Sequence, residues 1–113
     1  DKPIASIETI SANDFAKINL SNQLKIFDVR KSTEYNSAHI ISAINAPLND
    51  IDSNHVMYNK DEEVYIHCAG GYRSIIANSI LKSKGYHNLI DVLGGFSSIR
   101  NTDIHIKENI CTN

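Results

Sequence analysis

Short, mostly apolar runs recur along this chain and alternate with segments that carry helix signals. Lys25–Arg30, Val64–Ile66 and Asn88–Leu93 are such runs, and each stops at a charged, polar or glycine-containing segment. Runs of this length and composition are typical of strands buried on both faces. Ile44–Pro47 adds a short extended piece, because the residue before a proline is driven out of helical geometry.

The segments between these runs predict helices. Ser11–Asp14 resembles a capping box, and Leu48, Ile51 and Met57 would form the apolar side of a later helix. Gly85 is placed to end another helix. The predicted helices begin after Ser11 and extend over Ser32–Ser37 (a brief helix or turn), Leu48–Tyr58, Ser74–Gly85 and Phe96–Arg100.

Strands that alternate with helices predict a three-layer α/β/α fold, in which a parallel sheet is covered on both faces. In such sheets the functional loops lie at the carboxyl ends of the strands. With 113 residues the chain is expected to be a single domain over 1–113, with a core of about 7–100. From about residue 103 no periodicity is visible, so 103–113 is expected to be a tail or an edge segment. Because the chain begins at Asp1, we expect a piece excised from a larger polypeptide.

Charge and cysteine content narrow the possible partners and compartments. A net charge of −2 and a pI of about 6.2 argue against nucleic acid or an anionic membrane as the main partner. No apolar run approaches the roughly 18 residues of a membrane span, and no secretory signal is visible. Two cysteines form no disulfide framework, which favours a reducing compartment and predicts a cytoplasmic location. Cys111 is expected to be an exposed thiol rather than a disulfide partner of Cys68.

The segment Cys68-Ala69-Gly70-Gly71-Tyr72-Arg73 carries the clearest chemical signal. It joins a predicted buried strand to a predicted helix. Backbone N–H groups of such a loop can converge on one point, and the helix start adds partial positive charge there. An anionic sulfur or a bound oxyanion would be stabilised, so Cys68 is the candidate nucleophile. The alternative is a buried structural thiol, which the position before a Gly-Gly loop disfavours.

The charged residues near this loop have different expected roles. A positive charge at a helix start is electrostatically unfavourable, so we expect Arg73 to face an anion. Asp28, Arg30 and Glu34 are interpreted as an ion-pair and hydrogen-bond scaffold beneath the loop, and His39 as a further scaffold residue. The five histidines show no metal-ligand spacing, so no metal site is predicted.

Together these residues resemble a rhodanese domain, the sulfurtransferase module, over roughly residues 7 to 100. The loop between cysteine and arginine is one residue shorter than in the similar dual-specificity phosphatases, and a tighter loop suits a single sulfur rather than a tetrahedral phosphate. The matching segments are Asp28-Val29-Arg30, Glu34-Tyr35, His39-Ile40, Ala43-Ile44-Asn45-Ala46-Pro47-Leu48, His67-Cys68 through Arg73-Ser74, and Gly94-Gly95-Phe96.

The resemblance also implies a chemistry and a context. It implies a central sheet of about five strands and a sulfane-sulfur carrier that forms a persulfide on Cys68, without a cofactor. The donor would be a persulfide or thiosulfate, and the acceptor a thiol or cyanide. Ala69 stands where thiosulfate-using members often carry arginine, which favours persulfide donors. The loop is particularly similar to rhodanese domains appended to metallo-β-lactamase-fold proteins, including the persulfide dioxygenase type.

Two alternatives from other functional classes remain open. The first is a non-catalytic interaction or redox-sensing module that keeps the rhodanese fold. The second is phosphatase or arsenate reductase chemistry on the same cysteine, which the short loop and the lack of an evident general acid disfavour.

Overall fold

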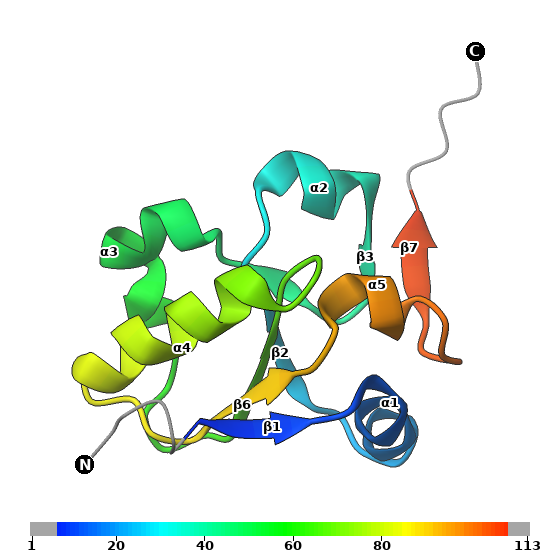
Figure 1. Ribbon diagram of the computed structural model, residues 1–113, viewed down its shortest axis with the longest axis horizontal. Helices are drawn as coiled ribbons and strands as arrows, with labels where there is room; N and C mark the ends of the chain where they lie inside the picture. Colours follow the sequence, from blue (N-terminus) through cyan, green and yellow to red (C-terminus); the bar gives the residue numbers. More distant parts are fainter. Residues whose placement is uncertain (1–6, 109–113) are drawn as a thin grey trace.

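The computed structural model describes residues 7–108, in which a five-stranded sheet has helices on both faces (Figure 1). The strand order is β1-β6-β5-β2-β4, and every neighbouring pair is parallel. The strands are β1 (Glu8–Ile10), β2 (Lys25–Asp28), β4 (Ile44–Asn45), β5 (Val64–His67) and β6 (Leu89–Val92). This confirms the predicted three-layer α/β fold with about five parallel strands.

The register of the sheet brings polar residues together at the carboxyl ends of its central strands. Asp28 pairs with His67 across β2 and β5, and Asp91 of β6 pairs with Ile66 on the other side of β5. All four residues of β5 and of β6 are buried. The carboxyl ends of these strands therefore place Asp28, His67 and Asp91 around the point where the chain leaves β5 for the Cys68 loop.

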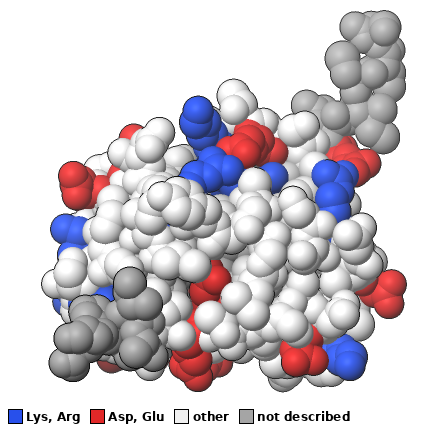
Figure 2. All heavy atoms as spheres, viewed as in Figure 1, with Lys and Arg blue, Asp and Glu red and all other residues white. Residues whose placement is uncertain are grey.

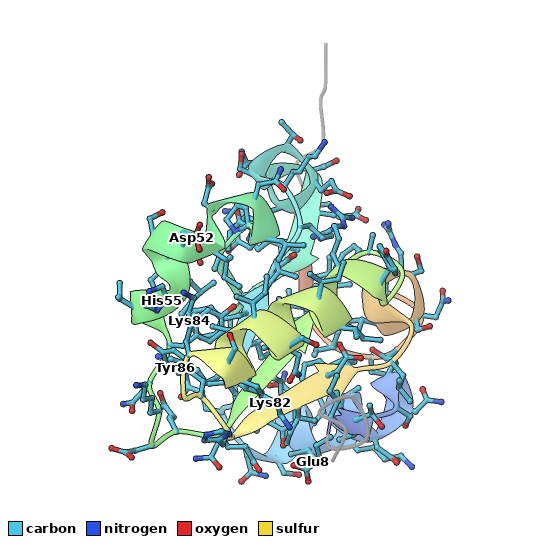
Figure 3. The ribbon with its side chains drawn as sticks, turned by 60° about the vertical axis from the view of Figure 1, so that its left-hand side comes forward. Glu8, Asp52, His55, Lys82, Lys84 and Tyr86 are labelled. Carbon is cyan, nitrogen blue, oxygen red and sulfur yellow. The ribbon has the colours of Figure 1, made fainter. Side chains whose placement is uncertain are left out.

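Helices cover the two faces of the sheet and enclose two apolar clusters. On one face α1 (Ala12–Ser21) and α5 (Gly95–Ile99) pack over Ile26, and on the other α4 (Tyr72–Ser83) packs over Phe27. The alternation of Ile26 and Phe27 between the clusters follows from the two-residue period of a strand. Figure 3 shows α4 lying across its face of the sheet.

The segment predicted as one helix from Leu48 to Tyr58 is instead broken into three short pieces. These are the 3-10 helix η2 (Leu48–Asp50), α3 (Ile51–Asn54) and the 3-10 helix η3 (His55–Met57). Ile51 is buried as expected, but Met57 is 46% exposed. The reason lies in Tyr58, which turns into the core and stacks on Phe27 with 4.0 Å between ring centroids, so the residue before it points outward.

A second, two-stranded sheet lies outside the main one. After α2 (Ser32–Ser37), β3 (Ala38–Ile40) pairs antiparallel with β7 (Ile106–Glu108), and Figure 1 shows this pair beside α2 and α5. Ile104, just before β7, is buried in the cluster beneath α1 and α5. The described residues after 103 are thus an edge segment rather than a tail. No helix within residues 7–108 combines the length and the apolar character that crossing a bilayer requires.

Candidate active site

Cys68 lies at the floor of the loop between β5 and α4, and it is 1% exposed. Its Sγ accepts a hydrogen bond of 3.0 Å from the backbone N–H of Gly71. Gly71 has φ 101° and is the N-cap of α4, a left-handed conformation that glycine adopts without steric cost. The turn brings the positive end of the helix dipole close to the sulfur. A negatively charged sulfur on Cys68 is therefore stabilised by both the N–H group and the helix.

The N-terminus of α5 holds the loop from behind. The N–H groups of Phe96 and Ser97 donate to the carbonyl oxygens of Cys68 and Ala69, at 2.6 and 3.0 Å. In trans peptides the next N–H points away from the carbonyl, so the N–H groups of Ala69 and Gly70 are directed away from α5. A Cβ on Gly95 would collide with both carbonyl oxygens. The Gly94-Gly95-Phe96 segment thus fixes which way the loop's amides point.

The opposite side of the loop is open. Gly70 is exposed, and a Cβ built there would meet nothing within 4 Å. Tyr72, the first residue of α4, is 77% exposed, and Ala69 is half-buried. Gly70 and Tyr72 are therefore the exposed residues of the loop, while the sulfur-bearing Cys68 is buried.

Arg73 faces an anion, and that anion is a side chain of the protein. Its Nη1 and Nη2 donate to Glu34 Oε1 and Oε2 at 2.8 and 3.0 Å, a bidentate ion pair between α4 and α2. The hydrogen bonds from Arg73 lower the pKa of Glu34 from 4.5 to about 2. Figure 2 shows basic and acidic side chains gathered together near α2. The guanidinium is thus partly neutralised before any substrate arrives.

Beneath the loop, Asp28 and Arg30 form a buried ion pair. Arg30 Nη2 donates to Asp28 Oδ2 at 2.8 Å and to the Ala38 carbonyl at 2.7 Å, and Asp28 Oδ1 accepts from the Arg30 N–H. The guanidinium carbon of Arg30 lies 4.2 Å from the centre of the Phe96 ring. This pair therefore ties the end of β2 to β3 and to the helix that holds the loop.

His67 connects the same layer to Cys68. Its ring stacks on Phe96 at 6.0 Å, and its Nδ1 donates to the Cys68 carbonyl oxygen at 3.1 Å. Burial lowers the pKa of His67, and Asp28 Oδ2, 3.6 Å from Nε2, acts in the opposite direction. We interpret His67 as a neutral residue that orients the Cys68 carbonyl.

The other predicted residues lie farther out or beyond the described chain. His39 stacks on Tyr35 at 3.8 Å and its Nδ1 bonds the Tyr35 carbonyl, so it braces α2 and β3. Within residues 7–108, no group of three or more potential ligands is arranged to hold a metal ion. Cys111 lies outside the described residues.

Sequence reasoning missed two buried polar residues behind the sulfur. Ser74 Oγ lies 3.6 Å from Cys68 Sγ, and Asp91 is buried in β6. The signal for Asp91 was visible, since it is a carboxyl in the middle of the apolar run Leu89–Val92. A charged residue inside a strand that is buried on both faces calls for a specific partner or function.

Comparison with known proteins identifies the family of this chain. Residues 11–102 match the family described as the rhodanese-like domain, and the chain belongs to that family. It is 35% identical over 92 residues to the putative sulfur carrier protein YrkF of Bacillus subtilis. This match covers 80% of this chain and 50% of that protein. It is 36% identical over 73 residues to the adenylyltransferase and sulfurtransferase uba4 of Ogataea parapolymorpha, covering 64% of this chain and 19% of that protein.

Solved structures show the same fold. The rhodanese-like domain protein of Staphylococcus aureus superposes with a TM-score of 0.80 at 29% identity, covering 90% of this chain and all of that one. A rhodanese-related protein of Thermoplasma volcanium gives 0.77 at 27% identity, covering 88% and 97%. The chain spans about half the length, or less, of the first two curated relatives described above.

Proposed function

We propose that this domain is a sulfurtransferase that carries sulfane sulfur as a persulfide on Cys68. The observation that carries the proposal is the 3.0 Å hydrogen bond from Gly71 N–H to Cys68 Sγ at the start of a helix of 12 residues. This arrangement favours negative charge on sulfur. The relatives named as a sulfur carrier and as a sulfurtransferase support the same reaction class.

The proposed cycle has two displacements and needs no cofactor. The Cys68 thiolate attacks the outer sulfur of a donor R–S–SH; a new S–S bond forms, the donor's S–S bond breaks, and its electron pair leaves with RS⁻. An acceptor thiolate or cyanide then attacks the outer sulfur of the Cys68 persulfide and releases the Cys68 thiolate. Loop N–H groups and the α4 N-terminus stabilise the anionic sulfur in both steps.

We propose that the donor is a low-molecular-weight persulfide rather than thiosulfate. Thiosulfate is a dianion, and the loop offers it little positive charge. Ala69 has none, and the guanidinium of Arg73 is already paired with Glu34. A persulfide needs only its outer sulfur to reach Cys68, past the open side of the loop at Gly70.

The test is the intact mass of the protein after incubation with glutathione persulfide. We expect one added sulfur atom, mapped by peptide analysis to Cys68, and its loss as thiocyanate when cyanide is added. Cys68→Ser should add no sulfur and keep its melting temperature, while Cys111→Ser should behave as the wild type. Sulfur uptake in Cys68→Ser would place the nucleophile elsewhere. A wild-type chain that stays unmodified would support the non-catalytic module.

A further inference from the structure

A buried polar layer separates α4 from β6 directly behind Cys68. Ser74 and Asn78 are buried on α4, four residues apart and therefore on the same side of the helix. Leu89 of β6 packs in the cluster beneath α4, and Asp91, two residues further along the strand, faces the same way. Asp91 is 1% exposed. Three polar side chains thus occupy an interface that apolar residues would otherwise fill.

Asp91 has little to compensate its burial. Neither carboxylate oxygen has a hydrogen-bond partner among residues 7–108, and the same holds for both amide atoms of Asn78. Burial raises the pKa of Asp91, and its interaction with the Ser74 hydroxyl opposes that rise. Ser74 is also in contact with the nucleophile, since its Oγ lies 3.6 Å from Cys68 Sγ. The Ser74 hydroxyl donates to the Gly71 carbonyl oxygen at 3.4 Å, a long hydrogen bond, and Ser74 lies on the side of α4 that faces Asp91.

The strand residues paired with Asp91 carry no charge. β5 and β1 pair Ile66 and Thr9 with Asp91, and neither titrates. Charged neighbours on these elements are directed elsewhere: Glu8 acts on Tyr65 across the sheet, His67 stacks on Phe96, and Arg73 is paired with Glu34. Lys82 lies about two helical turns beyond Ser74 on α4. Cys68 is the titratable group that Asp91 meets through Ser74.

We propose that Asp91 is a positioning residue that sets the direction of the Ser74–Cys68 hydrogen bond. When Asp91 is ionised, the Ser74 hydroxyl turns from the Gly71 carbonyl to donate to the carboxylate. It then presents a lone pair to sulfur, which suits the Cys68 thiol as donor. When Asp91 is protonated, it donates to Ser74 Oγ, and the hydroxyl turns to donate to the thiolate or persulfide. The proton that leaves the Cys68 thiol can pass through Ser74 to the Asp91 carboxylate, so the cluster keeps one negative charge.

This role rests on the proposed sulfur-transfer function for its catalytic meaning, but the coupling itself exists without a sulfur donor. A thiolate on Cys68 has Gly71 N–H and the start of α4 to stabilise it, whereas an ionised Asp91 has no comparable donors in the described chain. Two charges separated only by Ser74 would repel each other.

The test is the rate of Cys68 alkylation by iodoacetamide as a function of pH, resolved by peptide mass. In Asp91→Asn the side chain has no charge and its amide donates to Ser74, so we expect the profile to move to lower pH. A displacement of about one pH unit would raise the rate about ten-fold below the midpoint. Asp52→Asn is the matched control, because Asp52 is exposed on α3 and well away from α4's N-terminus (Figure 3); it should leave the profile unchanged.

The link through Ser74 is tested by a double-mutant cycle. Ser74→Ala should move the profile to higher pH, since the thiolate loses a donor, and in that background Asp91→Asn should have less than half its effect. An unmoved profile in Asp91→Asn, or an equal effect with and without Ser74, would overturn the proposal. If Asp91→Asn does not fold, the proposal is tested with Ser74→Ala alone. An unmoved alkylation profile in Ser74→Ala would also overturn the proposal. Because alkylation needs no donor, these results are independent of whether wild-type Cys68 takes up sulfur.

Discussion

Ala69 is the first residue after Cys68, and in the proposed function its side chain affects how much positive charge faces a sulfur donor. A second loop arginine would offer both Coulomb attraction and directional hydrogen bonds to an anionic donor. Ala69 offers neither, and it is half-buried beside the exposed Gly70. Arg73 is the cation that the loop does contain, and both of its terminal nitrogens donate hydrogen bonds to Glu34.

We predict that Ala69→Arg improves thiosulfate use selectively. One charge-assisted hydrogen bond gained at the transition state would raise kcat/KM for thiosulfate roughly ten-fold. The measurement is thiocyanate formation from cyanide, with glutathione persulfide as the reference donor in the same assay. In the unmodified domain kcat/KM should be higher for the persulfide. A thiosulfate-to-persulfide ratio that Ala69→Arg leaves unchanged would show that charge is not the cause of donor preference.

The residues of the loop were predictable from sequence because they are contiguous. Cys68 through Arg73 lie between a recognisable strand and a recognisable helix, and the two glycines mark the turn. The partner of Arg73 was not predictable in the same way. The sequence indicates that Arg73 needs an anion, but Glu34 lies 39 residues away, and only the packing of α2 beside α4 brings the two together. Long-range pairing of this kind leaves no local pattern.

At the scale of elements, the Glu34–Arg73 pair joins α2 to the start of α4. Glu34 also accepts the backbone N–H of Lys31 at 3.0 Å, so it caps its own helix while it holds the next. The pair is about a third exposed, with side-chain exposures of 29% and 34%. Solvent therefore screens part of its energy.

We predict that Glu34→Gln lowers stability at neutral pH by about 1 kcal/mol, after allowance for this screening. The folded-state pKa of Glu34 is about 2 against an ordinary 4.5, so the contribution is fully present above 4.5 and is lost as pH falls toward 2. Urea denaturation at several pH values should show the difference between wild type and Glu34→Gln shrinking across that interval. Glu108→Gln, which breaks the more exposed pair with Arg100, serves as the control and should cost little at any pH. A Glu34→Gln difference that does not depend on pH would mean that the hydrogen bonds, not the charge, hold the helices.

The elements that sequence patterns located well are those with long or fully apolar signals. β5, β6 and α4 fall close to their predicted positions, although α4 begins at Tyr72 and not at Ser74. The prediction of a single helix from Leu48 to Tyr58 was wrong. The helical spacing of three apolar residues does not reveal that the side chain of Tyr58 enters the core. Tertiary packing overrides a weak periodic signal of this kind.

At the scale of the whole molecule, β3 and β7 show how the last described residues close the fold. Each strand has three residues, and their partners are far apart in the sequence: Ala38 pairs with Glu108 and Ile40 with Ile106. Strands this short carry too few residues to display an alternating pattern. The sequence accordingly left two possibilities for the residues after 103, a tail or an edge segment. Ile104 distinguishes them, because its side chain is 5% exposed and packs in the cluster beneath α1 and α5.

We predict that Ile104→Ala lowers the free energy of unfolding by about 2–4 kcal/mol, the range for truncating a large buried aliphatic side chain. The cost comes from lost burial and from a cavity beneath α5, whose N-terminus holds the Cys68 and Ala69 carbonyls. Ile41→Ala is the matched control: Ile41 follows β3 directly and is 59% exposed, so its truncation should change stability by less than about 0.5 kcal/mol. Chemical denaturation of both variants measures the difference. Equal and small losses would mean that the segment after residue 103 contributes nothing to the core, and sulfur uptake on Cys68 should then be insensitive to both substitutions.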